Sequence, residues 1–125
     1  MAHDEYIAGV CNIGPEEIAR RRIVGWGSLV ITLVIFIVLV WSGVNPLWRV
    51  FIFFPAALSE AGFLQAYFHF CAGFARMGVF NFDAVGQTEH VTDESAKTQD
   101  KKRGRQITLY AVLIGMVITI IAVMV

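Results

Sequence analysis

The sequence NPLWRVFIFFPAALSEAGFLQAYFHFCAGFAR, residues 45–76, is an apolar segment that also carries polar and ionisable side chains. The apolar segments on either side of it, residues 23–43 and 106–125, contain no charged residue. An ionisable group inside a membrane span is costly, so its presence points to a buried partner or a transport pathway. We therefore expect any specific chemistry of this chain to lie in residues 45–76.

The composition predicts an all-α membrane protein with three transmembrane helices. The chain has 125 residues, of which 57% are hydrophobic, and its formal net charge is zero. Apolar runs of about 20 residues match the thickness of a bilayer's hydrocarbon core. We predict a single membrane domain, residues 1–125, with spans at 23–43, 47–75 and 106–125.

Local signals divide the rest of the chain. Residues 1–22 read as a cytoplasmic tail with a short helix, because Gly14 suits an N-cap, Pro15 suits the first helical position and two glutamates follow. Pro55 predicts a kink in the second span. Residues 76–105 read as a cytoplasmic loop, with a new helix starting at Thr92-Asp93-Glu94.

The distribution of basic residues predicts the orientation. Nearly all of them fall on the side shared by the N-terminus and the long loop, and Arg49 alone falls on the other. The positive-inside rule then places the N-terminus in the cytoplasm and the C-terminus on the opposite side. We expect a multi-pass protein of a bacterial inner membrane or an organelle equivalent.

The second span supplies the candidate site residues, which are intramembrane polar groups suited to contacts with a partner: Ser59, Glu60, Gln65 and His69. Glu60 lies about 20 Å along this span, near the bilayer midplane. It is either a titrating or ion-coordinating carboxylate, or a structural group bonded to a partner helix. The polar residues occupy both faces of the expected helix, which favours contact with further subunits.

His69 is the candidate cofactor ligand. It is the only histidine within the predicted spans, and it would ligate a haem or chlorophyll-type pigment, pair with Glu60 of a neighbouring chain, or form structural hydrogen bonds near the inner interface. We predict no metal site from the cysteines, because Cys11 and Cys71 belong to no ligand motif. Cys71 reads as a packing residue.

Basic residues near the span ends are candidates for contacts with lipid headgroups: Arg49, Lys101, Lys102, Arg103 and Arg105. The balanced charge argues against a nucleic-acid partner. The expected partners are membrane lipids and either other membrane subunits or copies of the same chain.

Three functions remain open at this point. The first is a small subunit with a structural or assembly role in a larger membrane complex. The second is a homo-oligomeric proton or ion channel or transporter that uses the intramembrane carboxylate, and the third is a haem- or pigment-binding subunit. We do not expect an enzyme acting alone, because no catalytic motif is present and the aqueous segments are short.

Overall fold

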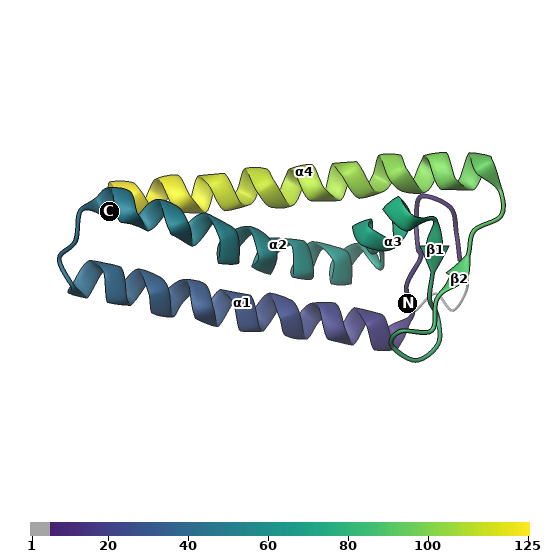
Figure 1. Cartoon of the computed structure of the whole chain (residues 1–125), viewed down its shortest axis with the longest axis horizontal. Helices are drawn as coiled ribbons and strands as arrows, with labels where there is room; N and C mark the ends of the chain where they lie inside the picture. Colours follow the sequence, from purple (N-terminus) through teal and green to yellow (C-terminus); the bar gives the residue numbers. More distant parts are fainter. Residues whose placement is uncertain (1–5) are drawn as a thin grey trace.

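A computed structural model describes residues 6–125 and shows three long helices lying side by side in an elongated bundle (Figure 1). The first five residues of the predicted tail lie outside the described part of the chain. The helices are α1 (Pro15–Trp41), the 3-10 helix η1 (Pro46–Ile52), α2 (Phe53–Phe68), α3 (Ala72–Met77) and α4 (Glu94–Met124). Two short antiparallel strands, β1 (Val79–Phe80) and β2 (Glu89–His90), complete the described fold.

Helix α1 begins where the sequence indicated. Gly14 is the N-cap with an extended backbone, Pro15 is the first helical residue, and Glu16 and Glu17 lie in the first turn. At about 1.5 Å per residue, its 27 residues extend roughly 40 Å, which exceeds the thickness of a hydrocarbon core. The predicted short helix before the first span is therefore the first part of α1 itself.

The second apolar segment is built from two kinds of helix. Residues Pro46–Ile52 form the 3-10 helix η1, and the α-helical hydrogen bonding of α2 starts at Phe53. Pro55 consequently lies in the first turn of α2, where a missing backbone N–H breaks few helical hydrogen bonds. The helix type therefore changes at Phe53, and the kink predicted at Pro55 stays a prediction.

The single helix predicted over residues 47–75 is wrong beyond Phe68. His69 ends α2 in the left-handed conformation, with φ 56° and ψ 41°, and its backbone N–H donates to the carbonyl oxygen of Gln65. A left-handed residue at this position closes the last turn and turns the chain away from the helix axis. Residues 72–77 then form the separate short helix α3.

Helix α4 begins at the predicted start and continues without a break to Met124. Asp93 is its N-cap, and the carboxylate accepts a hydrogen bond of 3.2 Å from the backbone N–H of Ser95. Gly104 lies within the helix and does not interrupt it.

Small residues bring the long helices close together. A Cβ atom on Gly62 of α2 would lie 2.7 Å from the backbone nitrogen of Gly25 in α1. A Cβ atom on Gly115 of α4 would lie 3.1 Å from Ala57 in α2, so these two helices also approach closely. Close packing of helices at small residues is typical of membrane bundles.

The three spans expose a largely apolar outer surface. In their most apolar stretches, only 17%, 22% and 28% of the residues are buried, for the first, second and third span in chain order. The helices are long and apolar enough to cross a membrane, as predicted from the sequence. An elongated bundle that exposes so much Val, Ile and Leu is consistent with a membrane protein.

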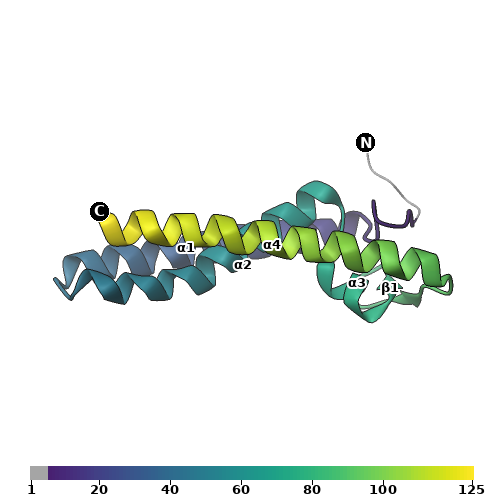
Figure 2. The same cartoon turned by 90° about the horizontal axis from the view of Figure 1, so that it is seen from above.

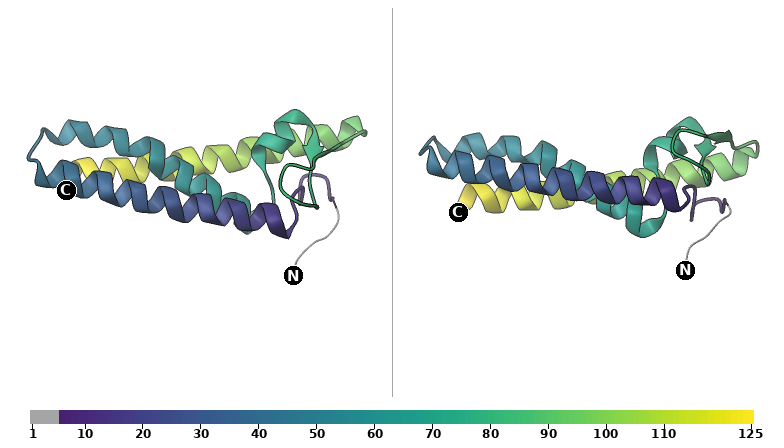
Figure 3. Two further views of the ribbon diagram at one scale, coloured as in Figure 1. Left: turned by 60° about the horizontal axis from the view of Figure 1, so that its bottom comes forward. Right: turned by 90° about the horizontal axis from the view of Figure 1, so that it is seen from below.

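One end of the bundle carries all the remaining structure, which we call the head and define as residues 6–14 and 69–93. The strands, α3 and the N-terminal segment gather there, and α4 extends past the start of α1 (Figures 1, 2 and 3). Tyr6 stacks on Phe80 at 4.9 Å between ring centroids, and Ile13 pairs with Asn81 as an isolated parallel bridge. The C-terminus lies at the opposite end (Figure 1).

Candidate functional site

Arg21 lies at the junction between the head and the spans, where it joins α1 to α2 and α3. Its Nε donates to Oε1 of Gln65 at 3.1 Å, and its Nη2 lies 3.0 Å from Sγ of Cys71. The same Nη2 lies 3.1 Å from Oε2 of Glu17, which is fully buried. An ion pair and hydrogen bonds together compensate the guanidinium for its loss of water.

Asn12 forms hydrogen bonds to the residues that follow α2. Its backbone N–H donates to the carbonyl oxygen of His69 at 3.2 Å, and its own carbonyl accepts from Asn81 at 3.0 Å. Its side chain bonds to both the backbone N–H and the carbonyl oxygen of Cys71. Asn12 is fully buried, so these bonds satisfy polar groups that water does not reach.

Asp100 fixes the N-terminal segment to α4. Its carboxylate accepts hydrogen bonds from the Tyr6 hydroxyl at 2.5 Å and from the Gly9 backbone N–H at 2.7 Å. Burial raises the pKa of Tyr6, and the hydrogen bond to Asp100 and the charge of Asp100 raise it further. Burial also raises the pKa of the Cys11 thiol, which suits a packed and unreactive side chain.

The structure separates the four predicted site residues instead of bringing them together. Ser59 donates to the carbonyl oxygen of Gly25 at 2.8 Å, and Gln65 accepts from Arg21, so both residues join helices of the same chain. His69 lies beyond the end of α2 and borders an open hollow together with Arg22 and Arg103. Within residues 6–125, no three metal-ligating side chains lie together.

Of these four residues, Glu60 alone has no hydrogen-bond or ion-pair partner for its side chain within residues 6–125. It lies one helical turn after Ala57, which contacts Gly115 of α4, and one turn before Leu64. Its side chain is half-buried, and within residues 6–125 it forms no hydrogen bond or ion pair. A carboxylate in this position can accept hydrogen bonds from a neighbouring molecule or carry a proton.

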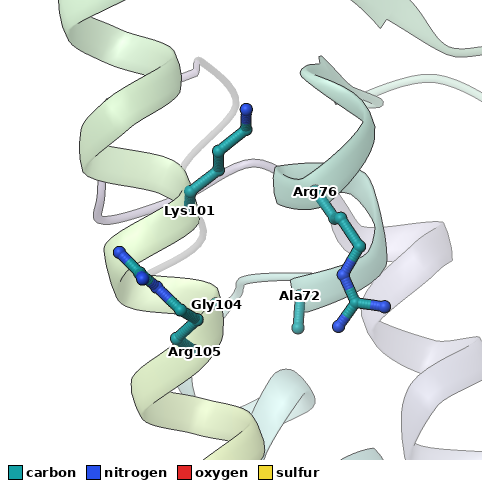
Figure 4. Close-up of a pocket in the computed structure, with 5 residues that line it drawn as sticks. All are labelled: Ala72, Arg76, Lys101, Gly104 and Arg105. Atoms are coloured by element: carbon teal, nitrogen blue, oxygen red, sulfur yellow. The ribbon is translucent and has the colours of Figure 1, made fainter.

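The basic residues predicted to contact lipid fall into two groups. Two of them are engaged inside the bundle: Arg49 donates to the Ala122 carbonyl at 3.0 Å, and Arg103 lies 4.5 Å above the ring of Phe68. Lys101 and Arg105 instead line a hollow between α3 and α4 (Figure 4). Lys102, beside Lys101 in sequence, is exposed and does not line this hollow.

Sequence reasoning missed Asn12, Glu17 and Asp100 as buried structural residues at the head end of the bundle. All three are fully buried although their residue types are usually exposed. The signal for Asn12 and Glu17 was the run Cys11-Asn12-Ile13-Gly14-Pro15-Glu16-Glu17, which places an amide and two carboxylates around the start of an apolar helix. The predicted cytoplasmic tail is, from Tyr6 onwards, a packed part of the structure.

Together these features define a helical protein whose three spans are suited to a membrane and whose polar groups concentrate at one end. The chain matches no protein-family model, no curated protein and no solved structure. Its function is therefore argued from the residues themselves.

Proposed function

We propose that this chain is a small, multi-pass integral membrane subunit with a structural or assembly role in a larger membrane complex. In the predicted orientation the N-terminus and the head face the cytoplasm. The observation that carries the proposal is Glu60, an ionisable side chain in the middle of a span with no partner in residues 6–125. In this role the chain is a non-catalytic component.

Several other polar groups in the spans support this reading, because they have partners within the chain. Thr32 donates to the Ser28 carbonyl at 2.7 Å, and Thr119 donates to the Gly115 carbonyl at the same distance. Ser59 and Arg49 donate to carbonyl oxygens on other helices. The described chain therefore satisfies these groups internally and leaves Glu60 for a group supplied from outside.

The position of Glu60 indicates which surface a partner helix would use. Ala57 and Leu64 lie on the same side of α2. Ala57 packs against Gly115 of α4, and Leu64 packs against the buried cluster that contains Ile107 of α4. Glu60 between them lies along the α2–α4 seam. A partner helix that lies on this seam with a Lys, Arg, Asn, Gln, Ser or Thr side chain would complete the carboxylate's hydrogen bonds and cover apolar surface.

The channel alternative uses the same carboxylate in copies of one chain. It also needs a polar route past Gln65 and His69, and here Gln65 is bonded to Arg21 while α2 ends at Phe68. The contacts of these two residues favour the subunit over a channel lined by one continuous face of α2. The pigment-binding alternative depends on His69 and predicts extra non-protein mass on the complex.

Native mass spectrometry of the protein extracted gently from its own membrane tests the proposal. We expect different polypeptides at fixed stoichiometry, and we expect Glu60→Leu to lower their recovery at least tenfold. Glu60→Gln, which retains hydrogen-bonding capacity, should retain more partner than Glu60→Leu. Glu16→Gln makes the same chemical change at an exposed position in the first turn of α1 and should have no effect.

Two outcomes would contradict the subunit reading. A monomer that carries no other polypeptide would remove it, and full partner recovery with Glu60→Leu would remove the Glu60 contact from which it is argued. A homo-oligomer whose proton flux in liposomes is abolished by Glu60→Gln would establish the channel alternative instead.

A further inference from the structure

A hollow of about 260 Å³ lies between α3 and α4 at the head end of the bundle, lined by Ala72, Arg76, Lys101, Gly104 and Arg105. Three of these five side chains are cationic and none is acidic. We propose that this hollow is a binding site for the phosphate headgroup of an anionic membrane lipid. This site includes Arg76, which was not among the basic residues predicted to contact lipid. Of those five predicted residues, it contains only Lys101 and Arg105.

Close packing at Gly104 creates the site. A Cβ atom there would lie 3.3 Å from Cβ of Ala75 and 3.4 Å from the Ala72 carbonyl oxygen, so α3 lies almost directly on α4. Lys101 and Arg105 are four residues apart and therefore share one side of α4. Arg76 comes from α3, so two elements that are distant in sequence supply the cations.

The cations border the hollow on different sides. Lys101 extends from α4 towards α3, the guanidinium of Arg76 lies beside Ala72, and Arg105 lies along α4 on the other side (Figure 4). The small residues Ala72 and Gly104 lie between them and leave the centre open. The charged ends point apart in Figure 4, and each of these long, exposed side chains can turn towards a phosphate group held beside Ala72 and Gly104.

The charges of this site are not neutralised within the described chain. The side chains of Arg76, Lys101 and Arg105 form no hydrogen bond or ion pair with any of residues 6–125. The nearby acid on α4, Asp100, is fully buried and accepts from Tyr6 and Gly9. Three cations around one hollow repel each other until an anion binds, and binding removes that repulsion.

The depth of the site relative to the bilayer favours a lipid over a soluble phosphate compound. Arg105 directly precedes the uncharged run 106–125, so in a bilayer it lies where that span meets the headgroups. In the predicted orientation this is the cytoplasmic leaflet, where basic pockets beside transmembrane helices bind anionic headgroups. The uncharged floor of the hollow can accept the glycerol end of the lipid.

Lipid binding to the purified full-length protein tests the site. Native mass spectrometry would compare retention of phosphatidylglycerol with retention of phosphatidylcholine by the wild type and by single variants. We expect Arg76→Gln, Lys101→Gln and Arg105→Gln each to weaken phosphatidylglycerol binding about fivefold, the effect of one cation near an anionic surface. All three residues are exposed, so these changes should preserve the helix content measured by circular dichroism.

Lys102→Gln is the matched control, because it removes the same charge one position along α4 but outside the hollow. The proposal predicts that this variant retains wild-type lipid binding. Equal losses in Lys101→Gln and Lys102→Gln would overturn it by showing diffuse attraction to the surface. Displacement of the lipid by millimolar inorganic phosphate would overturn the lipid assignment and identify a soluble phosphate site.

Discussion

The side chain of Asn12 pairs with the backbone of Cys71 in the way that a neighbouring strand would. Its Oδ1 accepts from the Cys71 N–H at 2.6 Å, and its Nδ2 donates to the Cys71 carbonyl at 3.1 Å. The two residues are 59 positions apart, and both are buried. This pairing gives the buried N–H of Cys71, the N-cap of α3, its partner and joins the two segments of the head.

Replacing Asn12 should open the head. Asn12→Ala leaves the buried N–H of Cys71 without a partner, at a cost of roughly 1–3 kcal/mol, while the Cys71 carbonyl keeps the hydrogen bond from the Ala75 N–H. We expect the thiol of Cys71, which is 5% exposed in the folded chain, to react with a maleimide at least tenfold faster in this variant. The rate would be followed by mass spectrometry in a Cys11→Ser background.

Asn12→Asp provides the control for that experiment. The carboxylate retains an acceptor for the Cys71 N–H but loses the donor to its carbonyl, so we expect an intermediate rate. Reaction of Cys71 at the wild-type rate in Asn12→Ala would show that this pairing does not hold the head closed.

The contact between Gly62 and α1 predicts a strong effect of a single methyl group. A Cβ atom on Gly62 would lie 2.7 Å from the backbone nitrogen of Gly25 and 2.8 Å from the Arg21 carbonyl, and backbone atoms cannot move aside cheaply. Gly62→Ala should lower the free energy of unfolding by about 1–3 kcal/mol, measured by thermal or denaturant unfolding in detergent micelles. Gly27→Ala is the matched control, because nothing lies within 4 Å of a Cβ atom there. A stable Gly62→Ala with a destabilised Gly27→Ala would contradict the helix packing.

The Tyr6–Asp100 contact predicts alkaline sensitivity of the head. The folded state raises the pKa of Tyr6 above its ordinary value of about 10, chiefly by burial and then through Asp100. Its contribution to stability is therefore complete below pH 10 and is lost as the pH rises from there towards the folded-state pKa. The difference between the ultraviolet titration curves of the wild type and Tyr6→Phe should show that the Tyr6 phenolate forms only well above pH 10. We expect the N-terminal segment to detach as the phenolate forms. A phenolate that forms at pH 10 without structural change would contradict the buried contact.

Arg49 should stabilise the end of the bundle opposite the head. Its guanidinium donates to the Ala122 carbonyl near the end of α4 and lies 5.8 Å from the ring centroid of Phe36 in α1. Arg49→Gln should destabilise the bundle by about 1.5–3 kcal/mol, the range for a hydrogen bond to a charged group, as measured by unfolding in micelles. Arg49→Lys, which retains the charge but not the planar group, should lose less stability. Equal stability of the wild type and Arg49→Gln would show that Arg49 contacts only the lipid headgroups.

The helix starts and the membrane-spanning lengths could be read from local sequence. Gly14-Pro15 and Asp93 mark the beginnings of α1 and α4 because capping and first-turn preferences act within a few residues. The end of α2 could not be read in the same way. Residues 69–75 continue the apolar pattern, and the helix stops there because His69 adopts a left-handed conformation and Asn12 bonds to the chain beyond it.

The sequence by itself determined three apolar segments long enough to cross a membrane, because hydrophobic length depends only on consecutive residues. Only the tertiary structure decided which polar residues are satisfied and which remain free. Ser59 and Gln65 found partners on α1, Glu60 found none in the described chain, and Arg76 came to border the same hollow as Lys101 and Arg105. These outcomes depend on contacts between residues far apart in the chain, so the position of each partner is set by helix packing and by where each helix ends.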